Sequence, residues 1–234
     1  IMWQLSESVD GMSEACIAFN APVVGGNVSL YNETNAVDIA PTPVVGVLGV
    51  HPDLSEPPPG IGLPPDSLLL VLGQEPESDV SMGGSRWAWE VGCCKDGVLP
   101  EFDLDHAVRT AAFVAESVQK QRLKAVHDVG EGGLAVALAE MAIRSGIGAK
   151  IKNHDNHISM FNESGGRVLV AIENRELDDF VKTAAARGVT AKVIGETGGS
   201  SLQFGPMVDV SLESLTVASE NQLPEALGQG TVNA

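Results

Sequence analysis

A proline-rich stretch divides this chain and limits what can fold on either side of it. Residues 51–66 hold six prolines among sixteen positions. Proline fixes its own φ angle and lacks the backbone N–H that helices and central strands need, so neither element can run through this stretch. The sequence therefore predicts two domains with a boundary near residue 60, one over residues 1–60 and one over residues 61–234.

Beyond residue 60, apolar runs of strand length alternate with segments of helical periodicity. Strands are predicted at residues 67–73, 125–129, 167–173 and 190–195, and helices at 104–123, 134–145 and 175–187. Asp103 or Asp105 would cap the first of these helices. The apolar face of that helix is predicted to consist of Leu104, Val108, Ala111, Ala112, Ala115 and Val118. Such alternation predicts an α/β layer structure.

The first sixty residues combine a helical pattern with two apolar runs. Residues 1–20 have apolar side chains near helical spacing, and the runs at 22–32 and 43–50 predict two neighbouring strands. The helix would start without a capping residue, and the chain has no leading methionine. We therefore expect this chain to be the carboxy-terminal fragment of a longer protein.

Charge and cysteine content narrow the class of protein. The formal charge is −17, with 14 Lys and Arg against 31 Asp and Glu, which opposes attraction to nucleic acid or anionic membranes. Neither partner is expected, and without a spanning apolar run or an export leader the expected location is cytoplasmic. Cys16, Cys93 and Cys94 have no disulfide or zinc spacing, and Cys16 is interpreted as a small core residue.

The stretch PVVGGNVSLYNET at residues 22–34 places a glycine pair, an amide and a hydroxyl at the entrance of the first predicted strand. Glycine lets a backbone N–H approach an anion closely. Asn27 offers an amide oxygen suited to Mg²⁺, and Ser29 can bind a phosphate or a hydroxyl group. On spacing alone the alternative stays open that this is a glycine β-bulge, in which Asn27 and Ser29 serve only the turn.

A second glycine loop follows the predicted strand at 125–129. The sequence HDVGEGG at residues 127–133 leads into a helix, a geometry that presents free N–H groups to an anion. Asp128 and Glu131 could bind Mg²⁺, and His127 could donate to a phosphate. Equally, Asp128 could cap the helix and His127 could be a structural residue.

Six segments carry a family resemblance. In chain order they are MWQLSESVDGMSEAC, PVVGGNVSLYNET, PTPVVGVLG, GGSRW, HDVGEGGLAVALAEMA and FNESGGRVLV. Together they resemble the last third of the synthetase subunit in the phosphoribosylformylglycinamidine synthase family. The resemblance spans nearly the whole chain.

The resemblance implies a mixed α/β (α+β) fold like that of aminoimidazole ribonucleotide synthetase. Residues 1–60 would be the carboxy-terminal part of a second A domain, whose sheet forms a barrel. Residues 61–234 would be a second B domain of α/β type. By pseudo-symmetry, residues 127–133 and 163–167 would correspond to loops that contact substrate and metal in the first half of the enzyme, and they would here be structural or hold an auxiliary nucleotide.

The activity implied is that of an ATP-dependent carbon–nitrogen ligase of purine biosynthesis. It converts formylglycinamide ribonucleotide, ATP and glutamine-derived ammonia into formylglycinamidine ribonucleotide, ADP and phosphate, through an iminophosphate. The resemblance assigns Gly26 to ATP, Asn27 to Mg²⁺ and Ser29 to the ribonucleotide. It implies no catalytic residue in this chain, because the catalytic histidine and most metal-binding carboxylates belong to the missing first half, so the fragment alone should be inactive.

The expected partners are a separate glutaminase subunit and a small bridging subunit, because the chain has no glutaminase region. Two alternatives stay open. One is another enzyme of the aminoimidazole ribonucleotide synthetase superfamily, such as a hydrogenase-maturation or thiamine-phosphate kinase relative. The other is a non-catalytic half that only scaffolds the barrel and the subunit contacts.

Overall fold

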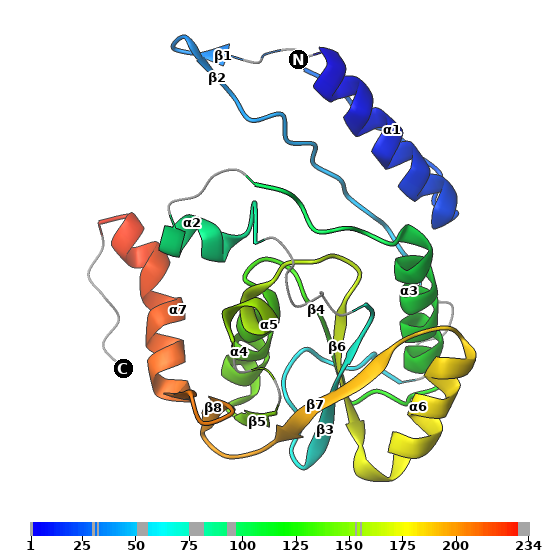
Figure 1. Cartoon of the computed structure of the whole chain (residues 1–234), viewed down its shortest axis with the longest axis vertical. Helices are drawn as coiled ribbons and strands as arrows, with labels where there is room; N and C mark the ends of the chain where they lie inside the picture. Colours follow the sequence, from blue (N-terminus) through cyan, green and yellow to red (C-terminus); the bar gives the residue numbers. More distant parts are fainter. Residues whose placement is uncertain are drawn as a thin grey trace. The chain divides into compact units, whose positions relative to one another are not determined.

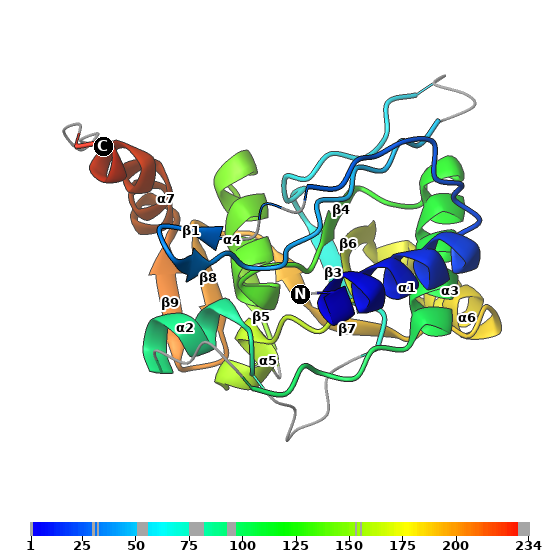
Figure 2. The ribbon, with the colours of Figure 1, turned by 90° about the horizontal axis from the view of Figure 1, so that it is seen from above.

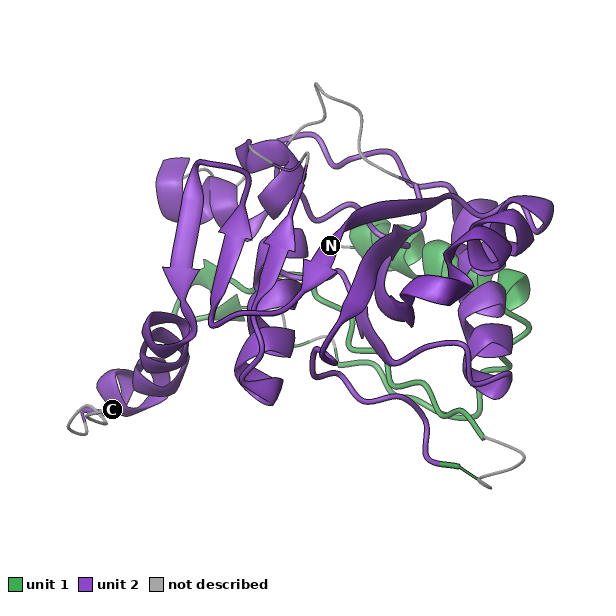
Figure 3. Cartoon of the chain, turned by 90° about the horizontal axis from the view of Figure 1, so that it is seen from below, with its two compact units in different colours: residues 1–56 green, residues 57–234 purple. Residues whose placement is uncertain are grey.

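A computed structural model describes residues 2–29, 31, 33–50, 56–74, 82–92, 97–152, 154 and 156–228. The chain separates into two compact units, residues 1–56 and residues 57–234 (Figure 3). Their assignment to an A domain and a B domain remains a prediction.

Among its described residues, the first unit has one helix and one short hairpin. The helix α1 spans Met2–Ala18, which confirms the helix predicted at the start of the chain, and none of its residues is buried. The strands β1 (Glu33–Thr34) and β2 (Val37–Asp38) pair antiparallel. Asn35 and Ala36 connect them with φ angles of 55° and 59°, the left-handed conformation that tight hairpin turns require.

The two strands predicted at 22–32 and 43–50 do not form, so these predictions were wrong for the residues that the structure describes. Residues 22–29, 31 and 43–50 have no regular secondary structure. Val24 is 97% exposed and Leu48 is 91% exposed, so neither run has a buried face. A strand is stabilised by pairing and by packing of one face, and the described part of this unit supplies neither for these runs.

The second unit is built on a seven-stranded sheet in the order β4-β6-β3-β7-β5-β8-β9 (Figure 1). Its strands are β3 (Ser67–Leu72), β4 (Ala125–Asp128), β5 (Ala149–Ile151), β6 (Val168–Glu173), β7 (Ala191–Thr197), β8 (Ser201–Phe204) and β9 (Val208–Ser211). All neighbouring pairs are antiparallel except β5 and β8. β3, β4, β6 and β7 confirm the four predicted strands, and β5, β8 and β9 were not predicted.

Helices cover both faces of this sheet (Figure 1). They are α2 (Arg86–Gly92), α3 (Leu104–Gln119), α4 (Gly133–Ser145), α5 (His157–Phe161), the 3₁₀ turn η1 (Asn174–Glu176), α6 (Leu177–Ala186) and α7 (Leu212–Ala226). Leu69 and Val71 of β3 join a core with α4, while Leu70 and Leu72 join a second core with α3 and α6. The alternation of β3 between the two cores explains its almost continuous apolar sequence. The predicted mixed α/β fold class is confirmed.

The predicted ends of the helices are largely confirmed. Asp103 caps α3, accepting a hydrogen bond from the His106 amide at 2.8 Å. Gly146 ends α4 in the left-handed conformation with φ of 70°. The apolar face predicted for α3 was only partly right. Val118 packs against the second core, but Ala111, Ala112 and Ala115 are exposed. The buried residues of the helix are Ala107, Thr110, Phe113 and Ser117.

Candidate functional site

The first candidate site, Gly26, Asn27 and Ser29, lies in an exposed, irregular part of the first unit. The Tyr31 amide donates a hydrogen bond to Ser29 Oγ at 3.3 Å, and Tyr31 OH accepts one from Thr34 Oγ1 at 3.4 Å. The segment therefore turns locally towards the β1–β2 hairpin. The amide of Asn27 and the hydroxyl of Ser29 are on exposed residues and open to solvent.

Packing does not explain the glycine pair in this segment. A Cβ built on Gly25 or on Gly26 meets nothing within 4 Å, and neither residue has a positive φ angle. The described residues here belong to no strand pair and form no β-bulge. The bond from the Tyr31 amide to Ser29 Oγ nevertheless agrees with the alternative that Ser29 serves the local turn. What remains is an accessible stretch of backbone N–H groups beside two oxygen-bearing side chains.

The second candidate site is the glycine loop at residues 130–133, which joins β4 to α4. Gly132 and Gly133 have φ angles of 77° and 66°. A Cβ on Gly133 would lie 2.8 Å from the carbonyl carbon of Phe161 and 2.6 Å from the carbonyl oxygen of Asn162. Glycine is therefore required at 133 both by conformation and by the close approach of the chain that follows α5.

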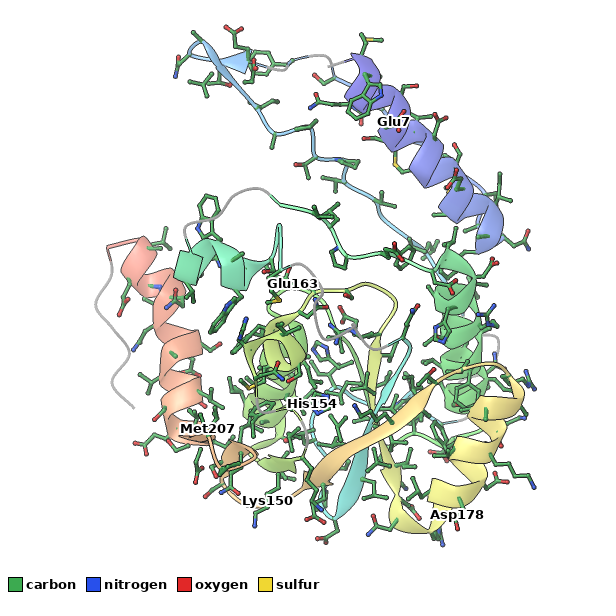
Figure 4. The ribbon with its side chains drawn as sticks, in the orientation of Figure 1. Glu7, Lys150, His154, Glu163, Asp178 and Met207 are labelled. Carbon is green, nitrogen blue, oxygen red and sulfur yellow. The ribbon has the colours of Figure 1, made fainter. Side chains whose placement is uncertain are left out.

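Glu163 ties this loop to α2. One carboxylate oxygen, Oε1, accepts hydrogen bonds from the Gly132 amide at 2.9 Å and from the Arg86 amide at 2.8 Å. The two donors are 31 and 77 residues away in sequence. Figure 4 shows Glu163 at the end of the unit where these segments meet. Charge-assisted bonds of this kind are stronger than bonds between neutral groups.

Aromatic stacking holds the same segments together. Trp87 of α2 stacks on Phe161, with ring centroids 4.5 Å apart, and on His157, with centroids 5.6 Å apart. Figures 1 and 2 both show α2 beside α5. Ser85 caps α2 by accepting a hydrogen bond from the Ala88 amide at 3.2 Å.

Next to this loop, His127 and Asp128 form a small polar group with α4. His127 Nε2 lies 3.3 Å from Glu140 Oε2, and His127 Nδ1 lies 2.7 Å from the Asp128 carbonyl oxygen. Asp128 does not cap α4, because the cap position is Gly132 and it has no side-chain bond. The predicted capping role is therefore wrong, and the Asp128 carboxylate is exposed beside Gly130.

The buried Arg167 completes the region. Its guanidinium donates to the carbonyl oxygens of Asn162 and Ser164, so it braces the turn that carries Glu163. Arg167 is 4% exposed. A buried cation bound to carbonyl dipoles fixes their positions. The sequence could not reveal how Glu163 is used, because its two hydrogen-bond donors are 31 and 77 residues away.

Within the described part of the chain, no group of three or more His, Cys, Asp or Glu side chains could hold a metal ion. Among the helices that the structure describes, none is long and apolar enough to cross a membrane.

Comparison with known families matches both units. Residues 65–204 match the AIR synthase related protein, C-terminal domain, and residues 1–51 match the AIR synthase related protein, N-terminal domain. The first match alone covers more than half of the chain. This chain belongs to the AIR synthase related family. Within the family, the glycine loop, α2 and Glu163 all lie inside the region matched to the C-terminal domain.

Among curated proteins, the chain is similar to subunits named PurL. The chain is 37% identical to phosphoribosylformylglycinamidine synthase subunit PurL of Parafrankia sp. over 98% of its own length and 30% of the relative's. It is also 37% identical to the PurL subunit of Rhizobium meliloti over 97% of its length and 31% of the relative's. The chain thus spans about a third of these curated relatives.

Solved structures agree at the level of the fold. T. maritima PurL complexed with FGAR matches with a TM-score of 0.56 and 14% identity, over 68% of this chain and 29% of that one. T. maritima PurL complexed with ATP matches with a TM-score of 0.52 over 68% of this chain and 27% of that one. The resemblance expected from the six sequence segments is confirmed.

Proposed function

We propose that this chain is part of a phosphoribosylformylglycinamidine synthase, an ATP-dependent ligase of purine biosynthesis. The observation that carries the proposal is 37% identity over 98% of the chain to a PurL subunit. The chain spans 30% of that relative, so the rest of the enzyme must supply the catalytic histidine and the remaining metal ligands. On this proposal the chain alone is inactive.

The proposed site is the segment that carries Gly26, Asn27 and Ser29. Gly26 would offer its backbone N–H to a phosphate of ATP, because no side chain obstructs the approach and nothing packs against it. The Asn27 amide oxygen would be one ligand of Mg²⁺, which prefers oxygen donors. The Ser29 hydroxyl would hydrogen-bond the ribonucleotide. All three residues are exposed, so they are accessible to a ligand whose binding site would be completed by other parts of the enzyme.

The proposed reaction explains why such groups are needed. The formamide oxygen attacks the γ-phosphorus of ATP and ADP leaves; ammonia then attacks the activated carbon, and phosphate leaves as the amidine forms. Mg²⁺, when bound, neutralises charge on the transferring phosphoryl group. The residues of this chain would act by holding the phosphate and the ribonucleotide in line, since positioning is the main contribution of a protein to phosphoryl transfer.

Partners and location follow from the same proposal. Ammonia would come from a separate glutaminase subunit, with a small bridging subunit in the assembly. The solved structure of PurLQS from Thermotoga maritima, which also matches this fold, supports an assembly of this kind. A charge of −17 supports an enzyme without nucleic-acid or membrane partners, and we propose a cytoplasmic location.

Substrate-dependent release of ADP tests the proposed function. The complete protein that contains this chain should release ADP when ATP, ammonia and formylglycinamide ribonucleotide are all present. It should release none when thiamine phosphate replaces the ribonucleotide. ADP release with thiamine phosphate would instead favour a kinase of the same superfamily, and no release with any substrate would favour the non-catalytic scaffold.

A further inference from the structure

The carboxylate of Glu163 is hydrogen-bonded to the backbone of the glycine loop at residues 130–133. Glu163 Oε1 accepts from the Gly132 amide at 2.9 Å and from the Arg86 amide at 2.8 Å. Gly132 is buried and Glu163 is half-buried. Adjacent glycine-rich backbone presents N–H groups that favour negative charge, and here a carboxylate takes that position.

The second donor belongs to α2, which Glu163 connects to the loop. Residues 82–92, called here the α2 segment, contact the rest of the unit at several points. Trp87 stacks on Phe161 at 4.5 Å, and Asn162 Nδ2 lies 4.0 Å from Met82 Sδ. The Arg86 guanidinium approaches Glu131 of the loop only at 3.9 Å, with both side chains exposed. One side chain, that of Glu163, therefore hydrogen-bonds the backbone of both the α2 segment and the glycine loop.

We propose that Glu163 is a latch that fastens the α2 segment over the glycine loop. The position of the glycine loop is fixed because Gly133 packs against the carbonyl groups of α5 and of Asn162. Arg167 fixes the turn that carries Glu163 by donating to the Asn162 and Ser164 carbonyl oxygens. Because the loop and the turn that carries Glu163 are both fixed, the carboxylate stays hydrogen-bonded to the Gly132 amide. That amide is then unavailable to an external anion. This role does not depend on the proposed function.

Hydrogen–deuterium exchange of the full chain tests the latch at the level of single amides. In Glu163→Ala we expect the Arg86 and Gly132 amides to exchange about tenfold faster or more, because a bond to a charged acceptor is lost. The Gly133 amide, which donates to the Gly130 carbonyl oxygen at 3.0 Å, serves as the internal reference. Glu131→Ala is the matched control, since it removes a carboxylate of the same loop that accepts neither amide. Unchanged exchange at Arg86 and Gly132 in Glu163→Ala would overturn the proposal.

A second variant is used if Glu163→Ala does not fold. Glu163→Gln retains an acceptor oxygen but loses the charge, so the Arg86 and Gly132 amides should still exchange faster than in the unaltered chain. Equal exchange at these two amides would count against the latch. Added inorganic phosphate should leave exchange at Gly132 unchanged in the unaltered chain. Slower exchange with phosphate would show an open anion position and would also overturn the proposal.

Discussion

At the scale of the residue, the backbone at Gly133 sets the shape of the glycine loop. Gly133→Ala should destabilise the second unit by about 1–3 kcal/mol, because a Cβ there meets backbone atoms that cannot move away and the φ angle of 66° is strained for alanine. The shift of the urea unfolding midpoint measures this cost.

Gly146 provides the control for that substitution. Its φ angle is 70°, but a Cβ there meets nothing within 4 Å. Gly146→Ala should therefore cost only about 1 kcal/mol, from conformation alone. If the two variants lost the same stability, steric contact with α5 would not be the reason for glycine at 133.

Glu116 makes a pH-dependent contribution. Its hydrogen bond from Lys120, at 2.5 Å, is the largest cause that lowers the pKa of the Glu116 carboxyl below its ordinary value, and Arg187 lowers it further. A lowered folded-state pKa stabilises the protein above the pKa of the unfolded chain, and the gain disappears as pH falls through the folded value.

Glu116→Gln should therefore lower the unfolding midpoint slightly at neutral pH and have no effect well below a pH of about 4. The effect should be small because the pair is at the surface. Urea unfolding of both proteins at neutral and acid pH checks this. A difference that persisted in acid would show that packing, and not charge, is responsible.

How far single residues could be predicted from sequence depended on the range of their contacts. The cap at Asp103 and the terminator Gly146 were predictable, since both act within one turn of their own helix. The double acceptor Glu163 was not, because its donors are remote in sequence. The proposed roles of Gly26, Asn27 and Ser29 came from family resemblance and remain predictions.

At the scale of the element, α3 shows why periodicity alone can choose the wrong face. The predicted face included three alanines, Ala111, Ala112 and Ala115, which are exposed. The buried face is set by Phe113, which packs against Phe180 of α6 with ring centroids 5.2 Å apart. A large aromatic side chain buries more area than several alanines, so it determines the orientation.

Phe113→Ala should consequently cost about 3–5 kcal/mol of unfolding free energy. Ala115→Ser, on the opposite side of the same helix, should change it by only about 0.5 kcal/mol. Chemical unfolding of the two variants checks both values. Similar losses in both would mean that the face predicted from sequence also packs.

The strands differ in a comparable way. β3 and β6 pair with each other and are buried on both faces. Burial on both faces gives each strand a nearly continuous apolar run, which made both strands predictable. The runs at 22–32 and 43–50 also carry several valines and leucines, interrupted by glycine, but remain irregular where described. Strand sequence is therefore not sufficient without a pairing partner. Short strands such as β5, with three residues, carry too little pattern to be predicted.

At the scale of the whole molecule, the two units differ in how much core they contain. Both buried clusters consist only of residues from 57–234. In the described part of residues 1–56 many large apolar side chains are exposed, among them Trp3, Val24, Val44 and Leu48. Stability should therefore reside in the second unit.

A chain reduced to residues 57–234 should fold and should unfold cooperatively at nearly the same denaturant midpoint as the full chain. Circular dichroism during urea unfolding measures this. Loss of the cooperative transition on deletion of residues 1–56 would show that the first unit supports the core of the second.

Asn27→Ala tests most directly the proposal that this chain supplies phosphate, metal and substrate contacts to a larger synthase. The measurement is ammonia-dependent turnover of the complete enzyme as a function of Mg²⁺ concentration, with thermal melting as the control for folding. We predict a fall in turnover of about tenfold or more, a higher Mg²⁺ requirement and unchanged melting. Near-normal turnover with an unaltered Mg²⁺ requirement would contradict the claim and leave the segment at 22–34 as scaffold.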